Sequence, residues 1–455
     1  MSIQSVNPAN GEIVKTYTAL SDEQTDEKIR KGHEAFLSWK ERSYEERARY
    51  MIAAAAILRK RKKELAWLMA LEMGKPVKAG EGEIEKCAAV CEYYAEHAAR
   101  FLAPEEVATD AKKSYITFNP LGVILAVMPW NFPFWQTFRF LAAALMAGNC
   151  GVLKHASNVP SCALIIEEIL LEAGFPAGVF QTLLVGSQAV DKIIEHPFIK
   201  AVSLTGSTEA GKKVAQKAAS LVKKAVLELG GSDPYLILKD ADLELAAAVC
   251  AESRLINSGQ SCIAAKRFIV VEEVADAFIA LFKEKMAAPK MGDPMDESVE
   301  IGPQARVELR YQLHEQVLKS IEKGAECILG GQVAPGQHAF YPPTILVNVK
   351  KGMPAYDEEL FGPVASVIRV KDEEEAIEVA NDTIFGLGSA VFTRDEARGE
   401  AIAATRLNAG CSFVNAYVRS TPELPFGGVK ESGFGRELGV YGIREFVNIK
   451  TVYVR

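Results

Sequence analysis

The feature that most constrains this chain is a regular alternation of short apolar runs with helical stretches, which begins at Leu121. The runs lie at residues 123–127, 152–153, 180–184, 201–205 and 225–227. Short apolar strands joined by helices are typical of a parallel sheet that is covered on both faces. A second set of the same kind extends from about residue 234 to 415. The sequence therefore predicts an α/β chain with two doubly wound, Rossmann-like domains built on parallel sheets.

Composition argues against several kinds of function. The 455 residues carry a net charge of 52 − 59 = −7, and basic residues form no long stripe, so we expect no nucleic-acid partner. No apolar run approaches about 20 residues, and we expect no membrane partner. The eight cysteines show neither a secreted-scaffold spacing nor paired metal-ligand motifs. They predict reduced thiols, a cytoplasmic location and no metal site.

Polar residues follow several of the predicted strands, at the edge where parallel sheets bind their ligands. Asn131 follows the first strand, and its side-chain amide could stabilise a developing oxyanion. Glu228 follows the last strand beside two glycines and suits a proton-transfer base, although it could equally be a surface carboxylate. Gly206 and Ser207 open a helix, where they could bind a phosphate or simply form a strand-to-helix turn.

Cys262 ends a polar, glycine-containing loop between a helical run and a strand. A thiol in such a loop can be held in place and still be open to a substrate, which suits a nucleophile. The alternative is a small buried hydrophobe, the commoner role of cysteine. Its position after Asn131, Gly206 and Glu228 in the chain favours a catalytic site.

These motifs, in this order, resemble those of the aldehyde dehydrogenase superfamily. The matching segments are PWNFP (129–133), TGSTEAG (205–211), ELGG (228–231), GQSC (259–262), EELFGP (358–363) and PFGG-K-SG (425–433). Within the superfamily the chain is most similar to the NAD(P)-dependent succinate-semialdehyde dehydrogenases. The resemblance implies oxidation of succinate semialdehyde to succinate, with glutarate semialdehyde or an aliphatic aldehyde as alternative substrates. A cofactor-independent thiol hydrolase or esterase is the alternative of another class.

The resemblance also implies roles for the matching residues. Cys262 would attack the aldehyde, Asn131 would stabilise the oxyanion, and Glu228 would activate the water that releases the acid. The cofactor-binding residues would be Met128, Pro129, Trp130, Lys154, Ser157, Gly206, Ser207, Leu229, Glu359 and Phe361. The substrate-binding residues would be Arg139, Trp135, Ser261 and Ser420, with Arg139 as the cation for the substrate carboxylate.

One departure from many NAD-using relatives concerns the cofactor. Those relatives carry a glutamate on the adenosine ribose where this chain has Ser157. The change removes a carboxylate that would repel a 2′-phosphate, and Lys154 remains to attract one. We therefore expect NADP⁺ to be preferred and NAD⁺ to be accepted as well.

The resemblance finally implies a division of the chain. Residues 1–99 and 121–229 would form the cofactor-binding domain, and residues 230–440 the catalytic domain. Residues 100–120 and 441–455 would form a small β element for oligomerisation. The resemblance implies a homodimer or a homotetramer formed through this element, and an edge strand tends to be paired rather than left open.

Overall fold

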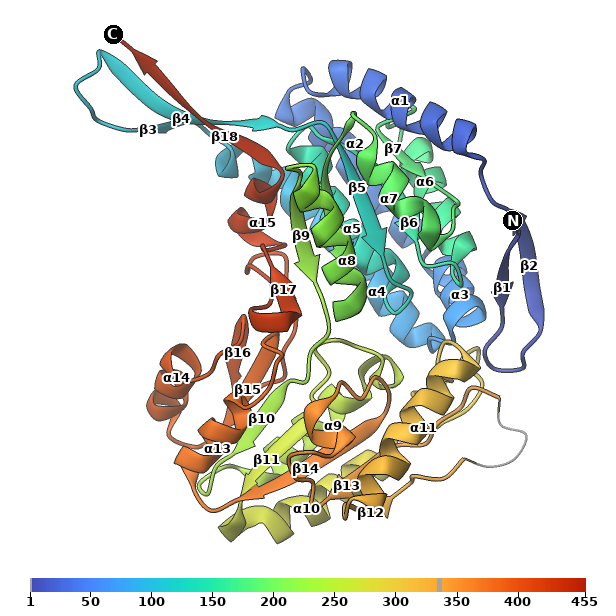
Figure 1. Ribbon diagram of the computed structural model, residues 1–455, viewed down its shortest axis with the longest axis vertical. Coiled ribbons are helices and arrows are strands. Elements are labelled where there is room, and N and C mark those ends of the chain that lie inside the picture. Colours follow the sequence, from blue (N-terminus) through green and yellow to red (C-terminus); the bar gives the residue numbers. More distant parts are fainter. Residues whose placement is uncertain (1, 334–337) are drawn as a thin grey trace.

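Two α/β bodies and a projecting arm make up the fold of the computed structural model, which describes residues 2–333 and 338–455 (Figure 1). The upper body is built on a six-stranded sheet that is parallel except for its first strand. Across the sheet the strands are β17 (Gly433–Phe434), β9 (Lys224–Glu228), β8 (Ile199–Thr205), β5 (Val123–Met128), β6 (Cys150–His155) and β7 (Phe180–Thr182). The predicted α/β class with Rossmann-like domains is confirmed.

Helices cover the sheet of the upper body, which explains why its strands are apolar on both faces. They are α1 (Asp22–Trp39), α2 (Tyr44–Lys60), α3 (Lys62–Met73), α4 (Val77–Phe101), α5 (Pro133–Met146), α6 (Pro160–Glu172), α7 (Val190–Glu195), α8 (Thr208–Ser220) and α15 (Gly439–Glu445), with the 3₁₀ turn η1 (Ser187–Ala189). The hairpin β1 (Ser2–Val6) and β2 (Ile13–Thr18) lies beside them. One large core joins these helices to the sheet.

The lower body is built on a seven-stranded sheet in which only the first strand is antiparallel. Its strands, in order, are β12 (Glu326–Leu329), β13 (Thr344–Val347), β14 (Val364–Val370), β11 (Arg267–Val271), β10 (Pro234–Ile237), β15 (Gly388–Phe392) and β16 (Cys411–Val414). Alternate residues of β10 enter different cores, Tyr235 and Ile237 on one face and Leu236 on the other. This period of two is what a strand covered on both faces requires.

The helices of the lower body complete those two cores. They are α9 (Leu243–Leu255), α10 (Glu272–Ala287), α11 (Val307–Glu322), α12 (Pro354–Asp357), α13 (Glu373–Asn381) and α14 (Glu396–Thr405), with the 3₁₀ turns η2 (Ile256–Gly259) and η3 (Lys430–Ser432). None of the helices in the described part of the chain is long and apolar enough to cross a membrane.

The arm is a three-stranded antiparallel sheet formed by segments far apart in the sequence. Its order is β18 (Val447–Val454), β4 (Lys113–Pro120) and β3 (Glu105–Glu106), so β18 lies at an edge. Strand β17 and helix α15 belong to the upper body, since β17 pairs with β9 and Ile443 joins the upper core. Strand β17 lies within the range 230–440 predicted for the catalytic domain, and that division of the chain stays a prediction.

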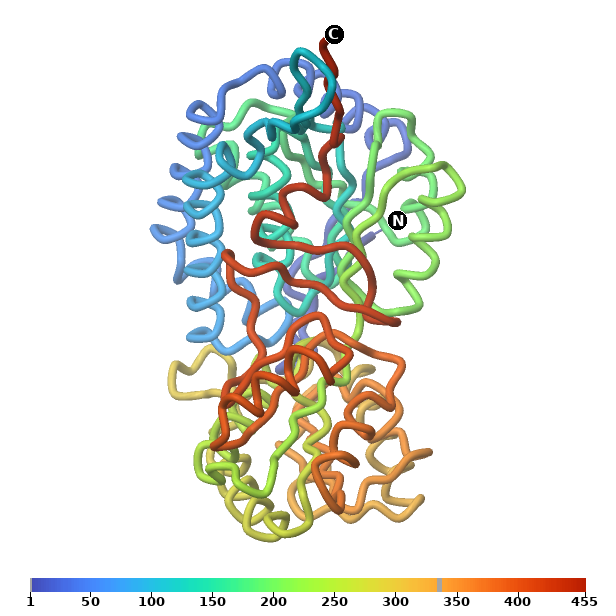
Figure 2. The backbone as a smooth tube through the Cα atoms, turned by 90° about the vertical axis from the view of Figure 1, so that its left-hand side faces the viewer, coloured from blue at the N-terminus to red at the C-terminus, as the bar shows by residue number. Residues whose placement is uncertain are grey.

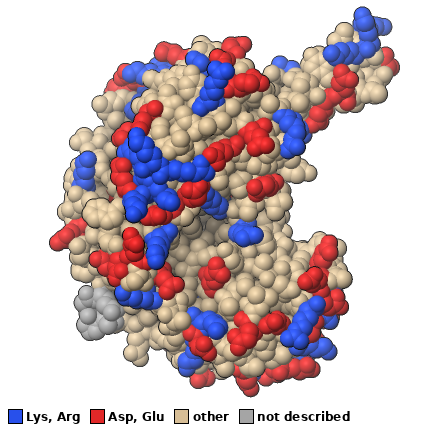
Figure 3. Space-filling view, turned by 180° about the vertical axis from the view of Figure 1, so that it is seen from behind, with Lys and Arg blue, Asp and Glu red and all other residues tan. Residues whose placement is uncertain are grey.

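The strands of the upper sheet end where the lower body begins, and this arrangement positions the site. The carboxyl ends of β5, β8 and β9 face the lower body, and the chain passes from β9 into β10 through residues 229–233. Figure 2 shows the bodies stacked along the long axis, and Figure 3 shows a hollow between them on the side of the arm. Acidic and basic side chains are interspersed over the face in Figure 3.

Candidate active site

The loop that carries Cys262 is an unusually tight turn. Asn257, Ser258 and Gly259 are left-handed in succession, with φ values of 53°, 56° and 76°. A Cβ atom on Gly259 would overlap the carbonyl carbon of Gly362, so only glycine fits there. The hydroxyl of Ser258 accepts a hydrogen bond from the Gly302 amide at 2.9 Å. The loop is therefore fixed against the segment that also carries Glu359.

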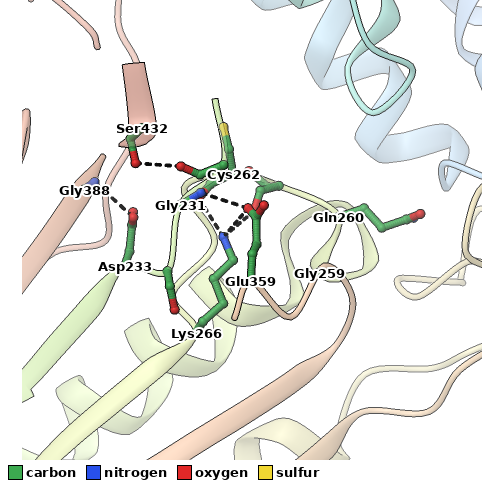
Figure 4. A network of polar contacts seen from close by, with 12 residues as sticks. Gly231, Asp233, Gly259, Gln260, Cys262, Lys266, Glu359, Gly388 and Ser432 are labelled. Atoms are coloured by element: carbon green, nitrogen blue, oxygen red, sulfur yellow. Dashed lines mark hydrogen bonds and ion pairs between the residues drawn. The ribbon is translucent and has the colours of Figure 1, made fainter. Parts of the chain in front are cut away.

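Cys262 is half-buried, and hydrogen bonds from Lys266 hold its backbone in place. The Lys266 ammonium donates to the carbonyl oxygens of Cys262 at 2.6 Å and Ser261 at 2.9 Å. Figure 4 shows the Cys262 sulfur on the opposite side from that ammonium. Burial raises the pKa of the Cys262 thiol to about 12, although Lys266 and Arg139 act to lower it. The thiol is therefore protonated at neutral pH, and a nucleophilic attack requires removal of its proton.

Asn131 lies against this loop. Its side-chain amide donates a hydrogen bond to the backbone carbonyl of Gln260 at 3.1 Å. The backbone carbonyl of Asn131 accepts one from the side-chain amide of Asn257 at 2.7 Å. A carboxamide nitrogen carries two hydrogens, so one remains to serve a ligand near Cys262. The buried Asn131 is thus held in place without using up its donor capacity.

Glu228 ends β9 and is buried beside the same loop. Within the described residues neither of its carboxylate oxygens has a hydrogen-bond partner. Burial raises the pKa of Glu228 to about 8; Arg139 lowers it and Glu437 raises it further. A Cβ atom on Gly427 would lie 2.8 Å from the Glu228 carboxylate, which explains a glycine in the PFGG segment. An unpartnered carboxyl group with such a pKa suits a proton acceptor near neutral pH.

The cofactor residues predicted near the reacting end come together in the cleft. The rings of Trp130 and Phe361 meet edge to face at 5.7 Å, although they belong to different bodies. Glu359 accepts from the Gly231 amide at 3.0 Å and pairs with Lys266 at 3.5 Å (Figure 4). The pocket they line contains Pro129, Trp130, Asn131, Gln136, Thr205, Gly206, Ser207, Leu229, Gly230, Cys262, Arg306, Leu309, Glu359 and Phe361.

A second groove lies beyond this pocket, along α8. It is lined by Lys154 and Ser207 among other residues. The Met128 carbonyl, at the end of β5, accepts a hydrogen bond from the Ala156 amide at 2.9 Å. Burial lowers the pKa of Lys154, and no carboxylate in the described residues lies within ion-pair distance of its ammonium. Ser157 is exposed at the end of β6. The groove therefore holds an uncompensated cation that suits an anionic ligand.

The predicted substrate residues separate into two groups. Arg139 is buried in an ion pair with Glu437, and its guanidinium also donates to the Thr205 hydroxyl at 3.4 Å. The contact of Arg139 with a substrate carboxylate stays a prediction. The carboxylate of Glu437 already neutralises the guanidinium. Ser420 instead accepts a hydrogen bond from the Lys86 ammonium at 2.8 Å, and that ammonium lies 4.0 Å above the Trp135 ring.

Sequence reasoning missed Lys86, Glu437 and Lys266. Lys86 lies within a helix rich in alanine and charged residues, where nothing in the pattern distinguishes an inward lysine from an exposed one. Glu437 lies 298 residues from Arg139 in the numbering (437 − 139), beyond any local signal. Lys266 lies four residues after Cys262, which ends the GQSC segment, so this closeness in sequence was the one available signal.

Comparisons with known proteins agree with this geometry. Residues 1–452 match the profile of the aldehyde dehydrogenase family. The chain is 48% identical over 454 residues to a probable succinate-semialdehyde dehydrogenase [NADP(+)] of Synechocystis, with all of both chains covered. It is 48% identical over 457 residues to succinate-semialdehyde dehydrogenase [NADP(+)] 1 of Mycobacterium tuberculosis, again with full coverage. A crystal structure of succinic semialdehyde dehydrogenase from Streptococcus pyogenes, in complex with NADP⁺, superposes with a TM-score of 0.97 at 38% identity and covers 99% of each chain.

Proposed function

We propose, from the premise that this chain belongs to the aldehyde dehydrogenase family, that it oxidises succinate semialdehyde to succinate with NADP⁺ as the preferred cofactor. The observation that carries the chemistry is that Cys262 and Asn131 line one cleft between the two bodies, with the buried Glu228 carboxylate near enough for its charge to act on the Cys262 thiol. The names of the curated relatives supply the substrate and the cofactor.

The residues of the cleft divide the chemistry between them. The Cys262 thiol first loses its proton to solvent water; the resulting thiolate attacks the aldehyde carbon, and the carbonyl oxygen becomes an oxyanion. The Asn131 amide and the Cys262 backbone N–H stabilise this oxyanion, and one such donor contributes about 3–4 kcal/mol to the transition state. Loss of a hydride then leaves a thioester on Cys262. Glu228 takes a proton from water as the water attacks that thioester, which releases succinate and the thiol.

The cofactor groove fits NADP⁺ because Lys154, which lines it, has no carboxylate partner among the described residues, and the exposed Ser157 three residues later carries no charge that would repel a phosphate. Lys154 and Ser157 would hold the 2′-phosphate end, and Glu359, Trp130 and Phe361 would hold the nicotinamide end. When bound, the cofactor supplies the acceptor for the hydride. NAD⁺ lacks the 2′-phosphate and would lose the attraction of Lys154 without meeting a new obstacle.

A panel of aldehydes assayed with both cofactors tests the proposal. We expect the highest kcat/KM for succinate semialdehyde with NADP⁺, and lower values for glutarate semialdehyde and for uncharged aldehydes. A stronger preference for an uncharged aldehyde would contradict the substrate. Ester or thioester hydrolysis as the dominant activity, with no aldehyde oxidation in the presence of NADP⁺, would favour the thiol hydrolase instead.

A homodimer or homotetramer and a cytoplasmic location complete the proposal. Within the described residues β18 pairs only with β4, and its side chains Ile449, Tyr453 and Val454 are exposed, which suits pairing with another copy. All eight cysteines are free thiols, as a reducing compartment would keep them. Light scattering after size exclusion would measure the assembly; a monomer at micromolar concentration would contradict it.

A further inference from the structure

Lys86 is a partly buried lysine whose ammonium has no counter-ion among the described residues. Its ammonium contacts the Ser420 hydroxyl and the Trp135 ring, and in the described part of the chain no carboxylate lies within ion-pair distance of it. The nearest carboxylate on its own helix, Glu83, is already occupied. Glu83 pairs with Lys75 and accepts hydrogen bonds from two backbone amides of α5, each at 2.9 Å.

Arg139, the other cation near this place, is in the opposite situation. Its side chain is only 2% exposed and is paired with Glu437. A second carboxylate would have to displace Glu437 and leave that group buried and unpaired, which is costly. Lys86 needs no such exchange, because a ligand carboxylate would add a partner where none exists.

The surroundings of Lys86 place it in the substrate region. Its two contacts, Ser420 and Trp135, come from different segments, and the family resemblance implies a substrate-binding role for both. Burial lowers the pKa of Lys86 to about 8, with a further contribution from Arg139, and the charge of Cys262 is among those that oppose the shift. Burial disfavours the charged form of this ammonium, and an anion that binds beside it stabilises that form.

On the proposed function, we infer that Lys86, together with the Ser420 hydroxyl, binds the distal carboxylate of the semialdehyde and selects aldehydes that carry one. Arg139 then serves as a positioning residue that holds Glu437 and tunes Glu228. The ligand class is a short aliphatic aldehyde with a terminal carboxylate.

The test compares Lys86→Met, which keeps the stem and removes the charge, with wild type on two aldehydes. The substrates are succinate semialdehyde and butanal, which has the same carbon count and no carboxylate. We expect kcat/KM for succinate semialdehyde to fall about 10- to 150-fold, mainly through KM, as for a lost charge-assisted hydrogen bond. Activity on butanal should stay within about threefold, which also shows that the variant folds, and Lys86→Arg should recover part of the loss.

Lys78→Met is the matched control, since Lys78 lies exposed on the same helix, and it should change neither aldehyde. An equal loss on both aldehydes, or no loss on either, would overturn the inference. A second readout is independent of turnover: succinate should protect Cys262 of wild type from iodoacetamide, and Lys86→Met should need at least about tenfold more succinate for equal protection. Equal protection in the two proteins would also overturn it.

These outcomes are separable from a failure of the proposed function. If wild type itself does not favour succinate semialdehyde over butanal, the proposed substrate fails before any variant is made. If wild type favours it and Lys86→Met favours it equally, only the role of Lys86 fails. In that case Arg139→Met, assayed on the same two aldehydes, would show whether Arg139 carries the selection.

Discussion

The protonation of Glu228 should control the release of the acid from the enzyme. The carboxyl group can accept a proton from water only when it is ionised, and its pKa is raised to about 8. About one-tenth of the groups are then ionised at pH 7 and about nine-tenths at pH 9. We therefore expect thioester hydrolysis to rise about tenfold over this interval, with a midpoint near pH 8. Below pH 7 the rate should fall about tenfold for each unit.

Replacing a charged neighbour of Glu228 should shift the pKa of its carboxyl group. Glu437 raises the pKa of Glu228 and Arg139 lowers it. Glu437→Gln removes the repulsion and leaves the charge of Arg139 to act on Glu228, so both changes lower the pKa of Glu228. The rising limb should therefore move to lower pH. The surface variant Glu431→Gln, which removes a carboxylate paired with Lys212 at 2.8 Å, should leave the midpoint unchanged.

Stopped-flow absorbance of the reduced nicotinamide separates the two steps. The first turnover gives a burst when the thioester forms faster than it is hydrolysed, and the linear phase then reports hydrolysis. Glu228→Gln should keep the burst and retain only the slow hydrolysis that hydroxide supports. A wild-type linear phase that is flat between pH 7 and 9, or that runs parallel to that of Glu228→Gln, would refute the role of Glu228 as the base.

Three other substitutions test separate parts of the site. Ser157→Glu should lower the ratio of kcat/KM for NADP⁺ to that for NAD⁺ at least about tenfold, because a carboxylate would then face the 2′-phosphate; steady-state kinetics with both cofactors that show an unchanged ratio would count against the assignment of the groove. Asn131→Ala should lower kcat about 100- to 1,000-fold with little change in cofactor binding, as for a lost oxyanion donor, and a loss confined to KM would point elsewhere. Gly259→Ala should lower the free energy of unfolding by at least about 1–3 kcal/mol in urea titrations, since its backbone is left-handed and its Cβ atom would overlap Gly362; full stability would show that the turn can relax.

Local signals were sufficient for the elements that carry the site. The apolar run at 123–127 became β5, and the run at 201–205 lies within β8, because buried parallel strands show in the sequence as continuous apolar segments. A capping box at Ser43, a signal that the sequence shows locally, begins α2. The break between α2, which ends at Lys60, and α3, which begins at Lys62, is less local, because Arg61 between them pairs with carboxylates of α6.

Contacts between distant segments were beyond such signals. The pairing of Arg139 with Glu437 depends on how the segment after the lower body returns to the upper sheet, and no local pattern encodes that return. The inward orientation of Lys86 likewise depends on Ser420 and Trp135, which the fold brings to it. Asn131 and Gly206 could be predicted because each closely follows an apolar strand, whereas these partners follow no rule of that kind.

Mass spectrometry of the acid-quenched enzyme tests the central claim most directly. Wild-type protein mixed with succinate semialdehyde and NADP⁺ should carry a succinyl group on the peptide that contains Cys262, and the adduct should be absent when NADP⁺ is omitted. Glu228→Gln should accumulate more of the adduct because its hydrolysis is slowed. A succinyl group on another residue, or no adduct in either protein during turnover, would contradict Cys262 as the nucleophile of an aldehyde oxidation.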